Sequence, residues 1–573
     1  MISQILPLLI VLPFIAGVLI CTFGRKTPSL AANLGVFIAG LVLIVSIGLV
    51  TQVAQYESAA QNDSTVESPA SGLVVPRVIY SPEWMTLRLP ISIHAHPIEW
   101  QLQLGADSLS GAMVLLSAIV TLAVLLMARQ QITNRTELYA GLIMITQSLL
   151  NGVFVSMDLL LFYVFFEAVL IPIIILINVW GDAKDALKAS RKFLLYTLAG
   201  SIPMVVGLVG LVVRSGTPEK PTTVLLTELS NFAYTTQLEA MSKPAASNEN
   251  AVAKAKSVLE SSTNIATNHT IILFTLLLGL GIKMAILPFH SWLPTTYEAT
   301  HPNTTALIAA VVGKLGIYGM LRIVLPLTPL AMIYYVQFIL GALGAIAIVY
   351  GAMIALGQTD LRRLLAYSSL SHLGFVTLGL TAMNREGLAG ASIQMFNHGL
   401  ITAAMFLLLA SIEQRRGRLT LNDESRGLAS AYPRIGTLMV FFTLAAAGLP
   451  GLNSFVGELL AMTGMMRVSI TITAIAALGT VLGAWYSLRV LQYLMFGSDG
   501  RTNSKTNLLS DIGATELFAL VPIAALCLAI GVYPSIAVNF LKSDVARMAV
   551  SLEPAVKAMH PNVDSSMLLS QSE

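Results

Sequence analysis

The feature that most constrains this chain is a long series of apolar runs, each about as long as a membrane is thick. A helix needs about 20 consecutive apolar residues to cross a hydrocarbon core of about 30 Å. Runs of this length recur along most of the 573 residues, and only 11% of the residues are charged, against about 25% in soluble domains. The sequence therefore predicts an all-α polytopic membrane protein. It excludes a nucleic-acid binder, a disulfide scaffold and a large soluble catalytic domain.

Apolar stretches bounded by charges, glycine or proline predict about 14 transmembrane helices. They are placed at 3–22, 29–53, 108–128, 136–156, 157–180, 189–213, 269–287, 303–325, 331–357, 361–383, 387–412, 433–467, 471–497 and 513–540. Two polar segments, 54–107 and 214–268, interrupt the series and are predicted to be external loops. The second is expected to be partly disordered, with a linker favoured over a short helix at 251–260.

Basic residues in the short connections predict the orientation. They follow the odd-numbered helices: Arg25, Lys26, Arg129, Arg135, Lys184, Lys188, Arg191, Lys192, Arg362, Arg363, Arg415, Arg416, Arg418 and Arg426. The positive-inside rule then places these loops in the cytoplasm and both termini outside.

Six ionisable residues lie well inside the predicted spans. A charge at mid-bilayer costs at least about 2.5–3.5 kcal/mol, so each needs a partner, a cavity or a task. The six are Glu167, Lys283, Lys314, His372, His398 and Glu458. Two acids and two amines could pair as static staples, but two histidines, which titrate near neutral pH, add nothing to such a clamp. A proton or cation path is therefore favoured over a purely structural role.

Two predicted spans contain helix breakers beside these charges. Pro288 removes the helical partner of the Met284 carbonyl, one residue from Lys283. The segment 448–451 breaks the helix that carries Glu458, and Asn453 or Ser454 is the expected N-cap of its second half. Paired broken helices point to inverted repeats, here helices 4–8 and 9–13. The predicted divisions are 1–128, 129–330, 331–500 and 501–573.

Two polar stripes follow helical spacing. Ser368 and His372 share one face, and Gln394, His398 and Thr402 share another. They could bond helix to helix or hold a file of ordered water, and the water file is favoured.

The remaining polar positions receive structural interpretations. Asp158 and Asp182, at span edges, are interpreted as capping or solvated, and Cys21 and Cys527 as packing residues. No dinucleotide, nucleotide, haem or CxxC motif is present, so we expect no cofactor or metal site in this chain.

Three motifs resemble those of a known family. Gly281-Ile-Lys-Met-Ala-Ile-Leu-Pro-Phe-His-Ser-Trp-Leu-Pro294, the run from Lys314 to Arg322, and the run from Ala366 to Phe375 are similar to the antiporter-like subunits of respiratory complex I. The resemblance covers nearly the whole chain. An acid at position 458 is typical of the M type, called chain 4 in mitochondria. Thr295-Thr296-Tyr297 and the long 214–268 segment depart from the family pattern.

The resemblance implies a role for each residue. Glu167 would modulate the charge of Lys283, and protons would pass from Lys283 through Lys314 and the region of His372 and His398 to Glu458. It also implies a subunit of a bacterial inner-membrane NADH-quinone oxidoreductase, beside L- and N-type neighbours. FMN, iron–sulfur clusters and quinone would belong to other subunits. The alternative is a subunit of a multisubunit Na⁺/H⁺ antiporter.

Overall fold

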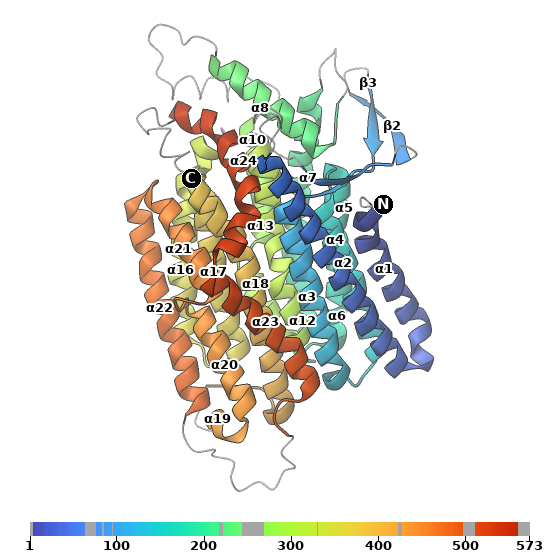
Figure 1. Ribbon diagram of the computed structural model, residues 1–573, viewed down its shortest axis with the longest axis vertical. Coiled ribbons are helices and arrows are strands. Elements are labelled where there is room, and N and C mark those ends of the chain that lie inside the picture. The colour runs from blue at the N-terminus through green and yellow to red at the C-terminus, as the bar shows by residue number, and fades with distance from the viewer. Residues whose placement is uncertain are drawn as a thin grey trace.

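The computed structural model is an elongated bundle of helices that run mostly along its longest axis (Figure 1). It describes residues 4–62, 76–82, 85–93, 96–216, 222–242, 269–328, 331–421, 427–496 and 510–559. The predicted helix alternative at 251–260 lies outside the described residues. Short strands and α8 lie beyond one end of the bundle, and α19 lies at the other end.

The first half of the chain forms α1 (Ile5–Phe23), α2 (Pro28–Asn62), α3 (Ser108–Gln131), α4 (Thr136–Val155), α5 (Leu159–Ala168), α6 (Leu170–Trp180), α7 (Ala186–Ser215), α8 (Leu226–Ser242), α10 (His269–Lys283), α11 (Trp292–Ala299), α12 (Pro302–Ala310), α13 (Leu315–Gly319) and α14 (Leu325–Leu327). The second half forms α16 (Gln337–Gly357), α17 (Leu361–Ala382), α18 (Arg385–Arg416), α19 (Leu428–Ala431), α20 (Pro433–Ala446), α21 (Asn453–Met466), α22 (Ile470–Met495), α23 (Ala514–Val532) and α24 (Ser535–Met559). Some of these helices are continued or joined by short turns of other helix types. The 3₁₀ turns are Gly24–Lys26 and Val312–Lys314, and the π turns are Met320–Val324 and Met332–Val336.

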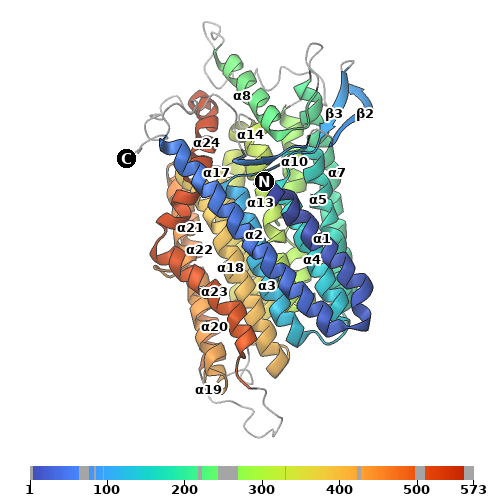
Figure 2. The same ribbon diagram turned by 45° about the vertical axis from the view of Figure 1, so that its right-hand side comes forward.

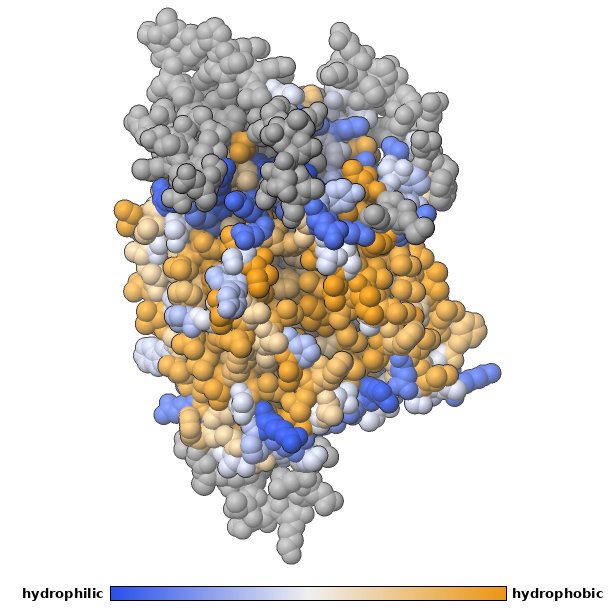
Figure 3. All heavy atoms as spheres, in the orientation of Figure 1, coloured by the Kyte–Doolittle hydropathy of each residue, from blue (hydrophilic) through white to orange (hydrophobic). Residues whose placement is uncertain are grey.

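The all-α membrane architecture is confirmed. Twelve helices among the described residues are long and apolar enough to cross a membrane, and Thr270–Lys283 and Pro433–Ala446 are shorter apolar helices. These two lie in the two spans that were predicted to be broken, 269–287 and 433–467. On the face that Figure 3 shows, a broad apolar band lies between two polar borders.

Three regions differ from the predictions. The segment 54–107 is more than a loop: α2 continues to Asn62, β1 (Val78–Tyr80) pairs with β4 (Leu104–Ala106), and β2 (Thr86–Ile93) pairs with β3 (His96–Gln101), both antiparallel. The helix α8 lies within 214–268. The predicted span 513–540 was wrong at its end, because Pro534 ends α23 and a second long helix, α24, follows.

The two helices that carry the polar stripes are among the most buried. The apolar windows of α17 and α18 are 100% and 94% buried within the protein, whereas those of α1, α2, α22 and α23 are 22–33% buried. α18 contacts α3, α12, α17, α20, α21 and α24, which places it at the centre of the bundle. Its first turn is capped by the side chain of Asn384, which accepts a hydrogen bond from the N–H of Gly387.

Candidate functional site

Lys283 is the last residue of α10, and its side chain is 3% exposed. Its Nζ donates a 2.5 Å hydrogen bond to the carbonyl of Phe166 and lies 3.4 Å from the centre of the Phe166 ring. Glu167 Oε1 is 3.7 Å from the same nitrogen, and neither oxygen of Glu167 has a hydrogen-bond partner among the described residues. The pair is therefore an ion pair without a direct hydrogen bond between its members.

Both members of this pair lie where a helix is interrupted. Glu167 is near the end of α5, and Pro172 in the following turn cannot donate to the carbonyl of residue 168. The predicted break after Lys283 is confirmed, since α11 begins only at Trp292. The indole Nε1 of Trp292 donates to the Ile282 carbonyl at 2.9 Å and satisfies one of the acceptors that the break exposes.

Lys314 lies in the short 3₁₀ turn Val312–Lys314 between α12 and α13. Its side chain is completely buried and donates to the Ala309 carbonyl. Two residues further on, a methyl group on Gly316 would lie 2.5 Å from the Leu280 carbonyl oxygen, so α13 packs directly on the end of α10. On the other side α12 packs against α18, the helix of His398. Lys314 therefore stands between the helix of Lys283 and the helix of His398.

His372 on α17 and His398 on α18 face each other with ring centres 5.3 Å apart. Both ring nitrogens of His398 lack a hydrogen-bond partner in the described part of the chain. A cavity of about 20 Å³ touches both rings together with Ser368, Thr402 and Ser454. This is room for about one water molecule, with several polar partners around it.

Glu458 accepts three hydrogen bonds or short contacts at one oxygen. Oε1 lies 2.9 Å from His372 Nδ1, 2.9 Å from Ser454 Oγ and 3.2 Å from Gln394 Nε2. Its other oxygen faces Gly448, where a methyl group would lie 3.1 Å from Oε2. The carboxylate thus joins α17, α18 and the broken α20–α21 segment.

The local details of this break were partly mispredicted. α20 ends at Ala446 and α21 begins at Asn453, as the glycines at 448 and 451 with positive φ require. The N-cap of α21 is Leu452, without a side-chain hydrogen bond. The expected capping by Asn453 or Ser454 was wrong, because the Ser454 hydroxyl is used by Glu458 instead.

The two polar stripes both bond helix to helix and line a small cavity. Ser368 bonds Tyr486 of α22 at 2.8 Å, and Gln394 bonds Ser454 and Glu458, so part of each stripe links helices. His372, His398 and Thr402 line the small cavity between them. A longer water file stays a prediction.

A buried network that sequence reasoning missed lies at the end of the bundle near β1 and β4. Arg322 makes a two-pronged ion pair with Asp107, at 2.5 and 2.8 Å, and both side chains are at most 3% exposed. Asp544 of α24 accepts hydrogen bonds from the backbone N–H and hydroxyl of Ser108. The only local signals were an Asp just before an apolar run and an Arg inside one.

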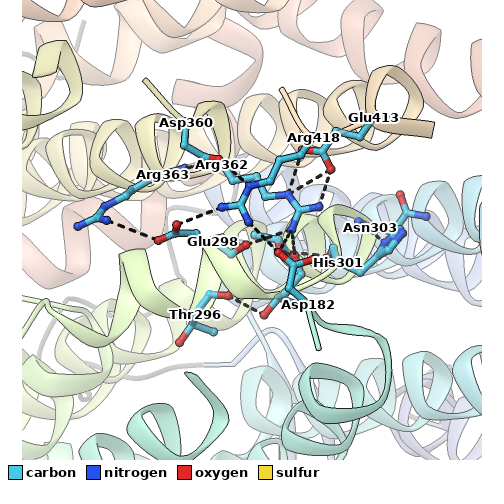
Figure 4. Close-up of polar contacts among 12 residues, drawn as sticks. Asp182, Thr296, Glu298, His301, Asn303, Asp360, Arg362, Arg363, Glu413 and Arg418 are labelled. Carbon is cyan, nitrogen blue, oxygen red and sulfur yellow. Dashed lines mark hydrogen bonds and ion pairs between the residues drawn. The ribbon is translucent and has the colours of Figure 1, made fainter. Parts of the chain in front are cut away.

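A second missed network joins the two halves at the arginine-rich end of the bundle (Figure 4). Arg362 of α17 pairs with Glu413 at 2.5 Å and with Asp182 at 3.2 Å. Arg418 pairs with Asp182, Glu298 and Asp360 at 2.7–3.0 Å. Asp182, which was interpreted as capping or solvated, is 36% exposed and in addition bridges two arginines. Asp158 does cap α5, through the N–H of Leu161.

The six predicted residues thus fall into two groups with Lys314 between them. One group is Glu167 with Lys283, and the other is His372, His398 and Glu458. Amines, imidazoles and a carboxylate that follow one another through the centre of an apolar bundle can pass a proton from one to the next. Fold and site together define a polytopic membrane protein of the ion-translocating class.

Residues 156–483 match the family described as NADH:quinone oxidoreductase/Mrp antiporter, TM, and the chain belongs to this family. It is 32% identical to NADH-ubiquinone oxidoreductase chain 4 of Chondrus crispus, over 76% of this chain and 80% of that protein. It is also 32% identical to NADH-quinone oxidoreductase subunit M of Rhodobacter capsulatus, over 78% of this chain and 81% of that protein.

Solved structures agree with this assignment. A chain of respiratory complex I from Thermus thermophilus with bound NADH is similar with a TM-score of 0.75 and 27% identity, over 96% of this chain and all of that one. A chain of the Mrp complex from Dietzia sp. shares the fold, with a TM-score of 0.69 and 18% identity, over 98% of each chain.

Proposed function

We propose that this chain is the M-type, proton-translocating membrane subunit of an NADH-quinone oxidoreductase of the complex I kind. The single observation that carries the proposal is the succession of buried titratable groups from Lys283 to Glu458. The relatives named subunit M and chain 4 support the same assignment. FMN, iron–sulfur clusters and quinone would lie in other subunits of the complex, and L- and N-type subunits would be its neighbours.

The first step takes place at Lys283. Its ammonium is stabilised by the Phe166 carbonyl and by the nearby carboxylate of Glu167. Because the two charges are 3.7 Å apart and share no hydrogen bond, Glu167 can move away without breaking one. Loss of this carboxylate leaves an ammonium buried without a counter-ion, which favours release of its proton.

The released proton would then pass to Lys314, which is buried beside the end of α10 and forms no ion pair among the described residues. The next acceptors are His398, whose ring nitrogens are unpartnered, and His372 across the one-water cavity. His372 Nδ1 already contacts Glu458 at 2.9 Å, so the last transfer follows an existing contact. Glu458 would pass the proton on toward the other side of the membrane.

We also propose that 129–330 and 331–500 are inverted repeats. The support is that each holds one broken helix with a charge beside the break, α10–α11 with Lys283 and α20–α21 with Glu458. By the positive-inside rule, the end with Arg362 and Arg418 would face the cytoplasm of a bacterial cell, and both termini would be periplasmic.

The experiment that tests the function is purification of the complex that contains this chain from gently solubilised membranes. We expect flavin- and iron–sulfur-bearing chains to copurify and NADH-quinone reductase activity to be present. Copurification with membrane chains alone, without redox activity, would contradict the proposal.

The second candidate is a subunit of a Na⁺/H⁺ antiporter, which the family description and the fold of the Dietzia Mrp chain favour. It predicts sodium transport in vesicles without quinone reduction. The complex I assignment predicts proton transport only while NADH is oxidised.

A further inference from the structure

A deep apolar cleft opens on the side of the bundle between α2, α3, α18, α23 and α24. Its volume is about 710 Å³. Most of its lining is aliphatic or aromatic, including Val50, Leu115, Phe396, Leu526, Ile530 and Phe540. A hollow is visible within the apolar band, below its polar border, on the face where α24 and α2 lie (Figure 3). Figure 2 shows α2 and α23 flanking this side of the bundle from a second direction.

The cleft runs inward from the edge of the membrane. Asp544 binds the N–H of Ser108, the first residue of α3, so this part of α24 lies level with the end of a membrane span. Lys542, two residues earlier, lines the mouth of the cleft. Asn397 lines its inner end, and on α3 the lining reaches Leu115, seven residues beyond Ser108 and about 10 Å along that helix. The cleft therefore reaches about a third of the way across a hydrocarbon core of about 30 Å.

The mouth of the cleft carries free donors. Lys542 and Asn539 are three residues apart and share one face of α24. Both are exposed, and in the described parts of the chain neither has a hydrogen bond or ion pair. Glu57, the acid at the mouth, is bound by the Ser543 hydroxyl and lies 4.0 Å from both Arg77 and Arg547. The mouth therefore offers an ammonium and an amide to an anion, while its own carboxylate is neutralised.

We propose that this cleft is a phospholipid site, with an acyl chain in the apolar part and the phosphate at Lys542 and Asn539. Cationic side chains at membrane edges attract anionic headgroups in this way. An unbranched acyl chain is the ligand that matches both the apolar wall and the polar mouth.

At the inner end of the cleft, a bound lipid would lie close to the candidate proton path. Asn397 precedes His398, and its Nδ2 donates to the Asn453 carbonyl at the start of α21 at 2.6 Å. An acyl chain against Asn397 keeps water out of the cleft at the level of His398 and limits proton leak there. This consequence rests on the proposed function, whereas the lipid site does not.

The site is tested in the intact complex, reconstituted in bilayers that contain phosphatidylglycerol with a photoactivatable diazirine in its acyl chain. After illumination, labelled peptides are identified by mass spectrometry. We expect labelling in 112–115 and 526–541. Lys542→Glu, which changes an exposed residue, should lower this labelling severalfold, and Ala112→Trp with Ala537→Trp should lower it to background.

Ile475→Trp on the lipid-facing side of α22 is the matched control and should leave the cleft labelling unchanged. Equal labelling in the native and Lys542→Glu complexes would overturn the phosphate site. Labelling of the cleft no stronger than that of α22 would overturn the proposal altogether. So would capture of another protein chain by a photoreactive amino acid placed at position 115. None of these outcomes depends on proton pumping.

Discussion

The two broken helices use the same backbone device around opposite charges. Lys283 is the last residue of α10, at the helix end where unpaired carbonyls concentrate negative potential. Glu458 lies in the second turn of α21, close to the positive end of its helix. Lys283 therefore lies at the helix end that favours its charge, whereas Glu458 lies one turn beyond the end that would favour it.

The two sites differ in how the charge is held. A backbone carbonyl binds Lys283, and its carboxylate neighbour is at 3.7 Å without a hydrogen bond. Three side chains, His372, Gln394 and Ser454, contact Glu458 at 2.9–3.2 Å. Because helix-end potential falls off within one turn, Glu458 needs these donors and Lys283 does not. The comparison shows that Lys283 can separate from its carboxylate without losing a hydrogen bond, whereas Glu458 cannot leave its partners without losing contacts at 2.9–3.2 Å.

The largest effect is expected from Lys283→Ala. Lys283 is the first proton carrier of the proposed path, so without its amine proton pumping in reconstituted vesicles should fall to background while the complex still assembles. Arg489→Ala is the matched control, since it removes a cation from the α22 span away from the site, and it should pump normally. Normal proton stoichiometry in assembled Lys283→Ala complex would contradict the assignment.

The charge swap Glu167→Lys with Lys283→Glu tests whether the pair is only a staple. If the ion pair only holds the two helices together, exchanging its charges should preserve proton pumping. We expect pumping to remain at background, because a carboxylate at position 283 would face the negative end of α10 and the Phe166 carbonyl. Pumping restored above the level of either single variant would favour a structural role.

A smaller effect is expected from Ser454→Ala, which removes one of the three partners of Glu458. One hydrogen bond to a charged group is worth about 1.5–3 kcal/mol, and the two remaining partners limit the loss, so pumping should fall severalfold rather than vanish. The readout is the pumping rate of the assembled complex while NADH is oxidised. Thr463→Ala is the control, because the Thr463 hydroxyl donates to the Leu459 carbonyl of its own helix. A pumping rate equal to that of the native complex would mean that the Ser454 hydroxyl does not support Glu458.

The smallest effect concerns a carboxyl that lies outside the spans and is assigned no proton transfer. Burial raises the pKa of the Asp158 carboxyl, the N-cap of α5, from 3.8 to about 6. A raised pKa stabilises the folded protein below pH 4, and this stability is lost as the pH rises through 6.

Asp158→Asn keeps the capping oxygen and should therefore stabilise the protein at pH 7–8, by on the order of 3 kcal/mol, and change nothing at pH 4. Thermal unfolding at the two pH values measures it. Pumping should be unaffected, and a pumping defect would place Asp158 in the path.

Much of this site was predictable, because the cost of burying a charge is a local signal. Glu167, Lys283 and Glu458 stand out in apolar runs, and Pro288 and the glycines at 448 and 451 mark the breaks beside them. Helix positions followed from run length, since a span must match the membrane.

The contacts that the sequence did not predict join residues that lie far apart in the chain. Arg322 and Asp107 are 215 residues apart, and Asp544 binds Ser108 over 436 residues. No local pattern pairs them. The β2–β3 hairpin was also missed, although residues 87, 89, 91 and 93 alternate as strand residues do. Its apolar positions are too few to be distinguished from a loop by composition alone.

The contact between α18 and α21 has a consequence for how a signal can travel. A methyl group on Gly390 would lie 2.3 Å from the Ala461 nitrogen, one on Gly457 would lie 2.4 Å from Gln394 Oε1, and one on Gly464 would lie 2.4 Å from the Gly387 nitrogen. The two helices thus approach each other closely at three positions, which leaves little space for one to slide along the other. On the proposed proton path, we therefore expect a signal to reach Glu458 as a change in electric field or in side-chain torsion rather than as a movement of α21 along α18.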